Sequence, residues 1–125
     1  MATIEIKSEG NLLILSVTGN LTAEEIEAVI QEHYQKASVK DVIWDLTNGT
    51  IITISNSSFK DLVKAVKESL ASGARQGGKT AYVGSADVEY GILHMCSAFA
   101  DMAKVPISYN VFRTIEKARS WIKKG

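Results

Sequence analysis

The stretch that decides the fold of this 125-residue chain is Val42-Ile-Trp-Asp-Leu46. It is short and nearly all apolar, which is typical of a central strand covered on both faces, as in a parallel sheet. Residues 80–83 form a second short apolar run, and residues 107–112 alternate in hydrophobicity after Pro106. Strands buried on both faces need helices on both sides. The sequence therefore predicts an α/β fold.

Helical patterns separate these strands. Thr22-Ala-Glu-Glu25 fits a capping box, in which Thr22 caps a helix and Glu25 reaches back to it. Apolar residues recur at helical spacing in three further segments, which begin near Phe59, Asp87 and Thr114. The four helices are expected near residues 23–37, 59–72, 87–105 and 115–124. We expect the lysines in the last turn of the final helix to stabilise it, because the carboxyl end of a helix carries a partial negative charge.

The chain opens with a predicted β-hairpin. Residues 3–7 and 12–18 are apolar-rich and flank Glu9-Gly10-Asn11, which is a strong turn signal. The element order is then ββαβαβαβα, and strand–helix–strand units favour right-handed parallel crossovers. We expect one domain over residues 1–125, a sandwich in which a mixed, mostly parallel sheet of about five strands carries four helices.

Composition excludes several classes of protein. Lysine plus arginine and aspartate plus glutamate each number 14, so the chain lacks the basic excess typical of nucleic-acid binding. One cysteine, Cys96, permits neither an internal disulfide nor a zinc cluster. We expect no signal peptide in the first residues, and no apolar run approaches the ~18 residues of a membrane span. We expect a cytoplasmic protein without a metal or cofactor.

One segment matches a nucleotide-binding motif in letters only. Gly73-Ala-Arg-Gln-Gly-Gly78-Lys79-Thr80 satisfies G-x-x-x-x-G-K-[ST]. In a phosphate-binding loop a strand precedes the glycines and a helix follows, so that backbone amides converge on phosphate. Here a helix precedes and a strand follows. We interpret the segment as a glycine helix cap and a turn.

No constellation of catalytic residues is evident. His94 and Cys96 lie two residues apart on a predicted helix and so point in different directions, and His33 is far away in sequence. Asp87 and Glu89 open the same helix, where carboxylates complement the helix dipole. We therefore expect no enzyme.

Polar residues follow the central strand. Asp45, Thr47 and Asn48 stand at its carboxyl end, and in sheets with parallel strands binding sites lie beyond such ends. They are candidates for a binding surface. The alternative is that Asp45 simply forms a turn.

Two serines precede Phe59, the first apolar residue of the second helix. Ser57 and Ser58 are placed to act as its N-cap. A phosphate at either one would lie on free backbone amides at the positive end of the helix, so both are also candidates for a phosphorylation switch. Neither has a histidine or lysine as its immediate neighbour in sequence, so we do not expect a nucleophile here.

Three segments together resemble the STAS domain family of anti-sigma-factor antagonists, and its SpoIIAA-like branch in particular. They are the opening hairpin followed by Gly19-Asn-Leu-Thr22, the central strand Val42-Ile-Trp-Asp-Leu46, and the closing Val111-Phe-Arg-Thr-Ile-Glu-Lys-Ala-Arg-Ser-Trp-Ile122. The resemblance covers nearly the whole chain.

The resemblance implies a regulatory domain that binds a protein partner. Family members carry a serine at the start of the second helix, within an Asp-Ser-Ser-Gly-like motif, that a partner kinase phosphorylates to release the domain. The matching stretch here is Asn56-Ser57-Ser58-Phe59, in which asparagine and phenylalanine replace the aspartate and glycine.

The sequence thus predicts a non-enzymatic regulatory interaction module whose partner is a protein such as a kinase or regulator, with a homodimer also expected. The alternative is a carrier or sensor of a small apolar or lipid-like ligand, because the branch is structurally similar to lipid-exchange domains. In that case the adaptable side chains of Met95, Phe99 and Met102 are expected to form the ligand wall.

Overall fold

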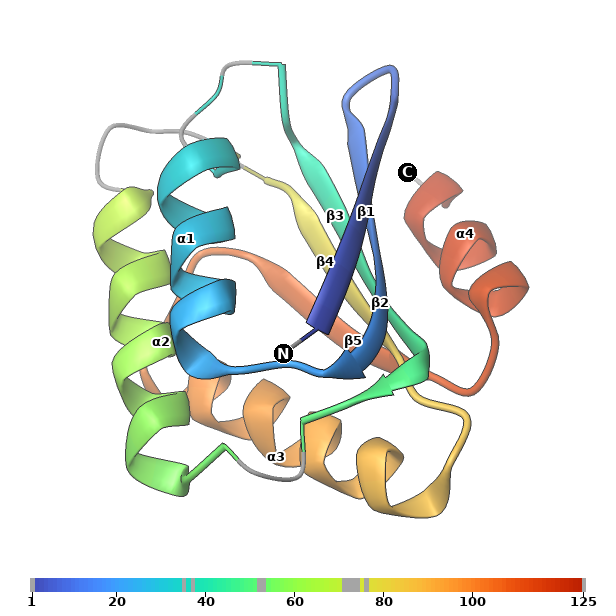
Figure 1. Ribbon diagram of the computed structural model, residues 1–125. Helices are drawn as coiled ribbons and strands as arrows, with labels where there is room; N and C mark the ends of the chain where they lie inside the picture. The colour runs from blue at the N-terminus through green and yellow to red at the C-terminus, as the bar shows by residue number, and fades with distance from the viewer. Residues whose placement is uncertain are drawn as a thin grey trace.

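A computed structural model shows a five-stranded sheet with helices on both faces (Figure 1). It describes residues 2–34, 36, 38–51, 54–70, 75 and 77–124. The strands are β1 (Ala2–Glu9), β2 (Leu12–Asn20), β3 (Asp41–Thr50), β4 (Lys79–Val83) and β5 (Ser108–Phe112). The helices are α1 (Ala23–His33), α2 (Asn56–Ser69), α3 (Asp87–Met102) and α4 (Ile115–Lys123).

The strands follow one another in the sheet in chain order, β1-β2-β3-β4-β5. β1 pairs with β2 antiparallel, and every other pair is parallel. Helices α1, α2 and α3 cover one face of the sheet and α4 covers the other (Figure 1). The predicted element order and fold class, a mixed and mostly parallel sheet with four helices, are confirmed.

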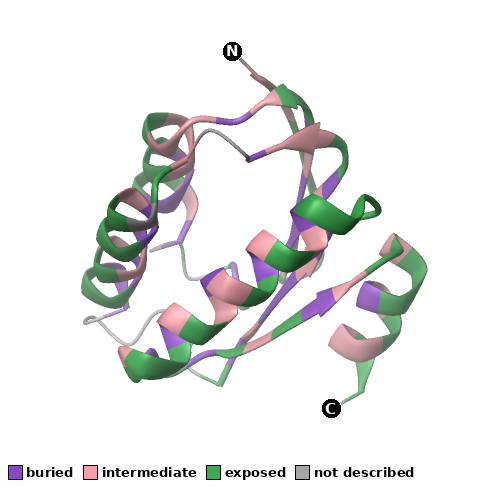
Figure 2. Cartoon of the chain, turned by 90° about the horizontal axis from the view of Figure 1, so that it is seen from below, coloured by how far each residue is buried: buried purple, intermediate pink, exposed green. Residues whose placement is uncertain are grey.

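The central strand is buried on both faces, as its sequence predicts. Val42, Trp44 and Leu46 of β3 point into the larger core beneath α1, α2 and α3. Ile43 points the other way into a smaller core, where it is joined by Ala118 of α4. Burial of such side chains contributes roughly 1.5–3 kcal/mol each, so this strand is a main source of stability. Figure 2 shows the buried residues along the inner sides of the helices.

A hydrogen bond inside the larger core joins α1 to β3. The indole Nε1 of Trp44 donates to the hydroxyl of Tyr34, the residue that ends α1, at 2.9 Å. Both side chains are buried. A buried tryptophan or tyrosine commonly finds such a partner for its polar atom, because leaving that atom unpaired costs free energy.

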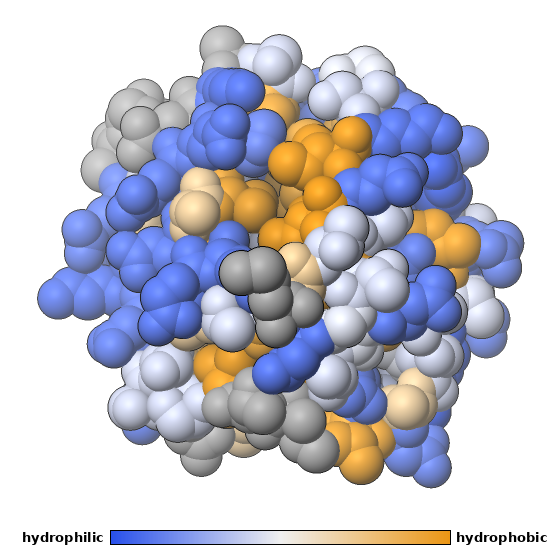
Figure 3. All heavy atoms as spheres, viewed as in Figure 1, coloured by the Kyte–Doolittle hydropathy of each residue, from blue (hydrophilic) through white to orange (hydrophobic). Residues whose placement is uncertain are grey.

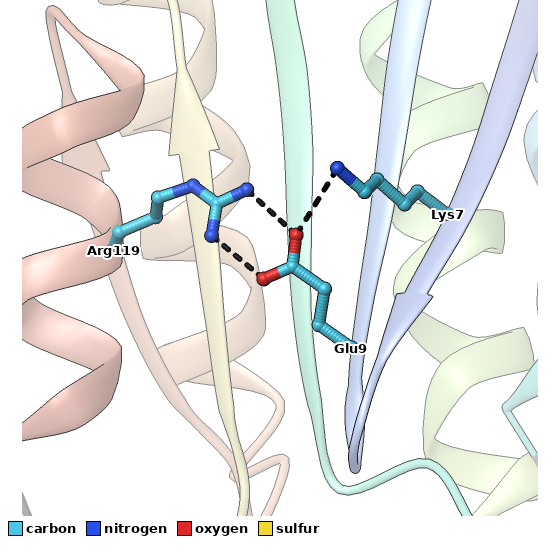
Figure 4. Close-up of polar contacts among 3 residues, drawn as sticks. All are labelled: Lys7, Glu9 and Arg119. Carbon is cyan, nitrogen blue, oxygen red and sulfur yellow. Dashed lines mark hydrogen bonds and ion pairs between the residues drawn. The ribbon is translucent and has the colours of Figure 1, made fainter.

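An ion pair fastens α4 to the opening hairpin (Figure 4). Both carboxylate oxygens of Glu9 accept from the guanidinium of Arg119, at 2.8 and 3.0 Å, and Lys7 lies 3.4 Å from the same carboxylate. The hydrogen bond from Arg119 lowers the pKa of Glu9 to about 2. The chain therefore links residues at its two ends across the smaller core.

Two boundaries differ from the sequence prediction. β3 runs on through polar residues to Thr50, because its backbone continues to pair with β2 there. Helix α2 begins at Asn56 instead of Phe59, and Ser55 is its N-cap. The prediction that Ser57 or Ser58 caps this helix is therefore wrong. At α1 the capping box of Thr22 and Glu25 is confirmed.

Candidate functional site

The candidate surface lies where the parallel strands end. β2, β3, β4 and β5 point toward the same end of the molecule, which also holds the amino ends of the helices that follow them (Figure 1). The positive amino ends of the helices and the carboxyl ends of the parallel strands lie together there, as at the binding edge of other α/β sheets. We call this region the strand-end surface: residues 45–48 of β3, 55–58 at the start of α2, 85–87 before and within α3, and Arg113.

Asp45 lies in the middle of β3 and hydrogen-bonds to a residue of its own strand. Its Oδ1 accepts from the backbone N–H of Thr47 at 3.0 Å and from the hydroxyl of Thr47 at 2.6 Å. This is the local side-chain to backbone hydrogen bonding that aspartate commonly makes, here within a strand and not in a turn. Asp45 is half-buried, whereas Thr47 and Asn48 are exposed. The carboxylate thus holds the backbone, and the side chains of Thr47 and Asn48 lie at the surface.

A β-bulge produces this geometry. Ser16 of β2 pairs with Asp45, but Thr18 pairs with Asn48, so β3 carries one more residue than β2 between the two pairs. Bulges re-aim side chains and are frequent beside functional sites. Just beyond it, a Cβ on Gly49 would lie 2.8 Å from Cγ1 of Val17, so glycine is required for the close approach of β2 and β3.

Arg113 ties the ends of three elements together. From the end of β5 its Nη1 donates to the carbonyl of Ser85 at 3.2 Å and to Oδ1 of Asp87 at 2.7 Å. Its guanidinium lies 4.0 Å from the ring centroid of Tyr90 on α3. The hydroxyl of Ser85 in turn donates to the carbonyl of Thr47 at 3.4 Å. These groups are largely exposed, so they shape the surface more than they stabilise the fold.

The serines at the start of α2 form their own cluster. The hydroxyl of Ser55 accepts from the backbone N–H of Ser58 at 3.2 Å, and it lies 3.0 Å from the hydroxyl of Ser58 and 3.3 Å from that of Ser57. Ser57 is exposed and Ser58 is half-buried. The next residue, Phe59, is buried in the core, which is the reason for a large residue here.

The two predicted groups lie at the same end of the molecule but are separate. Asp45 and Thr47 are joined by hydrogen bonds, as are the serines, and no hydrogen bond links the two groups among the residues that the structure describes. Sequence reasoning missed Ser55 and Arg113. Ser55 had a detectable signal, since serine directly before a polar first turn is a common N-cap. Arg113 had none, because its partners are distant in sequence.

The glycine-lysine motif has a structural role. Lys79 begins β4, and its Nζ donates to the backbone carbonyls of Trp121 at 2.9 Å and of Lys124 at 2.7 Å. The ammonium therefore caps the carboxyl end of α4, which agrees with the interpretation that the motif is no phosphate site. Gly73, Ala74 and Gln76 of the motif lie outside the described residues.

Arg75, within the same motif, is buried. Its Nη2 donates to the carbonyl of Lys79 at 2.9 Å and to the hydroxyl of Thr80 at 2.7 Å, and its Nε donates to the carbonyl of Lys40 at 3.0 Å. The guanidinium lies 4.7 Å from the ring centroid of Tyr34. Nη1 is buried and has no hydrogen-bond partner in the part of the chain that is described. The side chain thus joins the loop to the start of β3.

Within the part of the chain that the structure describes, no serine hydroxyl or cysteine thiol is hydrogen-bonded to a histidine or lysine side chain. Burial raises the pKa of the Cys96 thiol to about 12, which makes it a poor nucleophile. His94 stacks edge-on against Tyr90 at 4.6 Å between ring centroids. Within the described ranges, no group of three or more histidine, cysteine and acidic residues could hold a metal ion. Likewise, none of the helices described there is long and apolar enough to cross a bilayer.

The larger core contains a cavity of about 60 Å³. From α3 it is lined by Leu93, Cys96 and Ala100, and Met95, Phe99 and Met102, the residues predicted as a ligand wall, are not among its lining residues. Met102 is 78% exposed, and Met95 and Phe99 are half-buried. A water needs roughly 10–15 Å³ of such volume, so the cavity has room for a few water-sized groups, which is well below the roughly 300 Å³ of a typical small-molecule site.

No family model matches this chain, and no curated protein matches it in sequence. Solved structures do match it in fold. The anti-sigma-factor antagonist SpoIIAA in its unphosphorylated form matches with a TM-score of 0.59 at 16% identity, over 98% of this chain and 100% of that one.

Two further structures give the same result. An anti-sigma-factor antagonist from Mycobacterium paratuberculosis has a TM-score of 0.62 at 15% identity, over 99% of this chain and 96% of its own. An uncharacterized DUF3478 protein with a SpoIIAA-like fold, from Shewanella loihica PV-4, has a TM-score of 0.53 at 18% identity, over 97% and 93%. The chain therefore adopts the SpoIIAA-like fold of STAS domains, as its sequence predicts.

Proposed function

We propose that this chain is a non-enzymatic regulatory module that binds a protein partner through the strand-end surface, in the manner of an anti-sigma-factor antagonist. We further propose that phosphorylation of Ser57, with Ser58 as the second candidate, switches this binding. The partner is a kinase or another regulatory protein. Support comes from the fold shared with two anti-sigma-factor antagonists and from the geometry at the start of α2.

One observation carries the proposal: Ser55, and not Ser57, caps α2. The exposed hydroxyl of Ser57 is therefore not needed to cap the helix, and it stands within the first turn. A phosphate attached there would lie near free backbone amides at the positive end of the helix. It would also add a charge of about −2 to a surface whose first helical turn carries no acidic residue.

Lys60 provides a route from the phosphate to the neighbouring helix. It lies three residues after Ser57, which places the two side chains on adjacent positions of the helix surface. Its Nζ is 5.5 Å from the ring centroid of Phe99 on α3. An ammonium–phosphate contact is stronger than an exposed cation–π contact, so phosphorylation would draw Lys60 away from α3 and change both sides of the surface.

The test is to isolate partners from a native lysate with the wild type, Ser57→Asp, Ser57→Ala and Ser120→Asp, quantified by mass spectrometry. Ser120 is exposed on α4, on the other face of the sheet, and is the matched control for an added charge. We expect a partner retained by the wild type, Ser57→Ala and Ser120→Asp and lost from Ser57→Asp. Equal retention by all four chains would refute the switch, and absence of any specific partner would refute the module.

A further inference from the structure

The sheet has two edge strands, and they differ. On β5 the backbone N–H of Val111 donates to the side-chain Oδ1 of its neighbour Asn110 at 2.9 Å, so this edge is partly blocked by its own side chain. β1 lies at the opposite edge (Figure 1). An edge strand with free backbone groups is a template for pairing with another strand. β1 is therefore the edge to consider.

The outward-facing backbone groups of β1 can be assigned. Its register with β2 is unbroken from Ala2 to Glu9, and residues of an antiparallel strand alternate between facing the partner and facing away. The N–H of Ala2 donates to the carboxylate of Glu25 at 3.3 Å instead of to β2. By alternation, Ile4, Ile6 and Ser8 present their backbone N–H and C=O groups outward.

The side chains of β1 are arranged in two rows. Ile6 pairs with Leu15 of the larger core and so lies on the face covered by three helices, yet its side chain is 44% exposed. Helix α1 therefore leaves the middle of β1 uncovered. Figure 3 shows hydrophobic atoms near the middle of this side of the molecule, bordered by hydrophilic ones. Glu5 and Lys7 are exposed in the opposite row.

We propose that β1 is a dimerisation edge whose occupant is β1 of a second copy of this chain, antiparallel about a two-fold axis at Ile6. In this register each Ile6 meets the other, and Ile4 meets Ser8 through outward backbone groups. Glu5 of each copy then lies directly opposite Lys7 of the other. The charges of one strand are thus complementary to those of a second copy, as a two-fold interface requires.

Other registers are less favourable. An axis at Glu5 places Glu5 opposite itself, and an axis at Lys7 does the same for Lys7; like charges directly opposite each other are destabilising. An axis at Ile4 pairs Ile6 with Ala2, whose N–H is already bound by Glu25. An axis at Ser8 places Ile6 opposite Gly10 in the hairpin turn.

The register at Ile6 also extends an existing ion network. Lys7 already contacts Glu9, which is held by Arg119 (Figure 4). Adding Glu5 of the second copy beside Lys7 gives an alternating row of charges that continues across the two-fold axis. The affinity of the dimer should therefore depend on the charges of Glu5 and Lys7.

The test is a charge-swap complementation followed by native mass spectrometry and sedimentation velocity. The wild type is expected to form a concentration-dependent species of twice 13.6 kDa. Glu5→Lys and Lys7→Glu each place two like-charged pairs across the axis, so each alone is expected to dimerise about tenfold more weakly. Mixed in equal amounts, the two variants restore both opposite-charge pairs and are expected to form a heterodimer of wild-type strength.

Lys64→Glu, an exposed change on α2, is the matched control and is expected to dimerise like the wild type. Circular dichroism is used to check that every variant is folded. A wild type that stays monomeric at all concentrations would overturn the proposal. So would a Glu5→Lys chain that dimerises as strongly as the wild type, or a mixture that forms no heterodimer.

Discussion

The hydrogen bond between Trp44 and Tyr34 allows one prediction to be worked through. Tyr34→Phe removes one hydroxyl and leaves the ring, including the face that the Arg75 guanidinium covers at 4.7 Å. Packing is then nearly unchanged, but the indole N–H of Trp44 loses an acceptor at 2.9 Å inside the core. Tyr34 and Trp44 are 3% and 4% exposed, so bulk solvent does not reach the indole N–H, and a replacement acceptor is limited to a water in the cavity of about 60 Å³ that both side chains line.

The expected cost follows from that geometry. A buried donor left without a partner costs about 1–3 kcal/mol, and we expect the free energy of unfolding to fall by this amount. Urea denaturation followed by far-UV circular dichroism measures it without relying on tryptophan fluorescence. Tyr109→Phe is the matched control, because its hydroxyl has no hydrogen bond to any described residue. Its expected change is below about 0.5 kcal/mol.

A double-mutant cycle separates the hydrogen bond from packing. Trp44→Phe alone also loses stability, and the combined Tyr34→Phe and Trp44→Phe chain is expected to lose less than the sum of the single changes, by about 0.5–3 kcal/mol. Additive losses would contradict the account. So would a Tyr34→Phe chain as stable as Tyr109→Phe, since the core would then not depend on this contact.

Three further predictions concern the cap, the ion pair and the glycines. Ser55→Ala is expected to lower the free energy of unfolding, measured in urea, by about 1 kcal/mol, and Ser57→Ala by less than half of that. The reverse order would show that Ser57 is the N-cap. The pKa of Glu9 is lowered to about 2, so the contact adds stability that is complete above pH 4.5 and is lost as the pH falls toward 2. In Glu9→Gln the free energy of unfolding should therefore depend less on pH between 4.5 and 2. An unchanged dependence on pH would contradict the contact. A Cβ on Gly78 would lie 2.2 Å from the carbonyl oxygen of Lys40, whereas one on Gly91 within α3 meets nothing within 4 Å. Gly78→Ala should therefore lower the melting temperature, because it costs about 1–3 kcal/mol in the free energy of unfolding. Gly91→Ala should raise the melting temperature. Equal shifts in the two variants would contradict the packing.

The sequence predicted the parts of the fold that depend on side-chain periodicity. Residues 42–46 are apolar on both faces and form the buried centre of β3, and Thr22 with Glu25 forms the predicted capping box. The second half of β3 was not predicted, because residues 47–50 are held by backbone pairing with β2 and carry no apolar pattern. The start of α2 was placed too late for a similar reason, since its first turn is polar.

Contacts between distant segments were beyond prediction. Arg75 stands in a glycine-rich segment that resembles an exposed loop, and it is buried by Tyr34 and by residues around position 40. The apolar stripe of α3 predicted Met95, Phe99 and Met102 as a wall, but the helix turns a neighbouring set of residues toward the cavity. Periodicity identifies an apolar stripe but does not tell which part of it faces the sheet.

The most direct test of the proposed switch is mass spectrometry of the protein drawn from its own cells, first under native conditions and then denatured with peptide mapping. The account predicts two populations: a chain with a phosphate mapped to Ser57 or Ser58 and no bound partner, and an unmodified chain in complex with another protein. A phosphorylated chain bound to that partner as tightly as the unmodified one would contradict the switch. A chain that carries no phosphate and binds no other protein would contradict the proposed function as a whole.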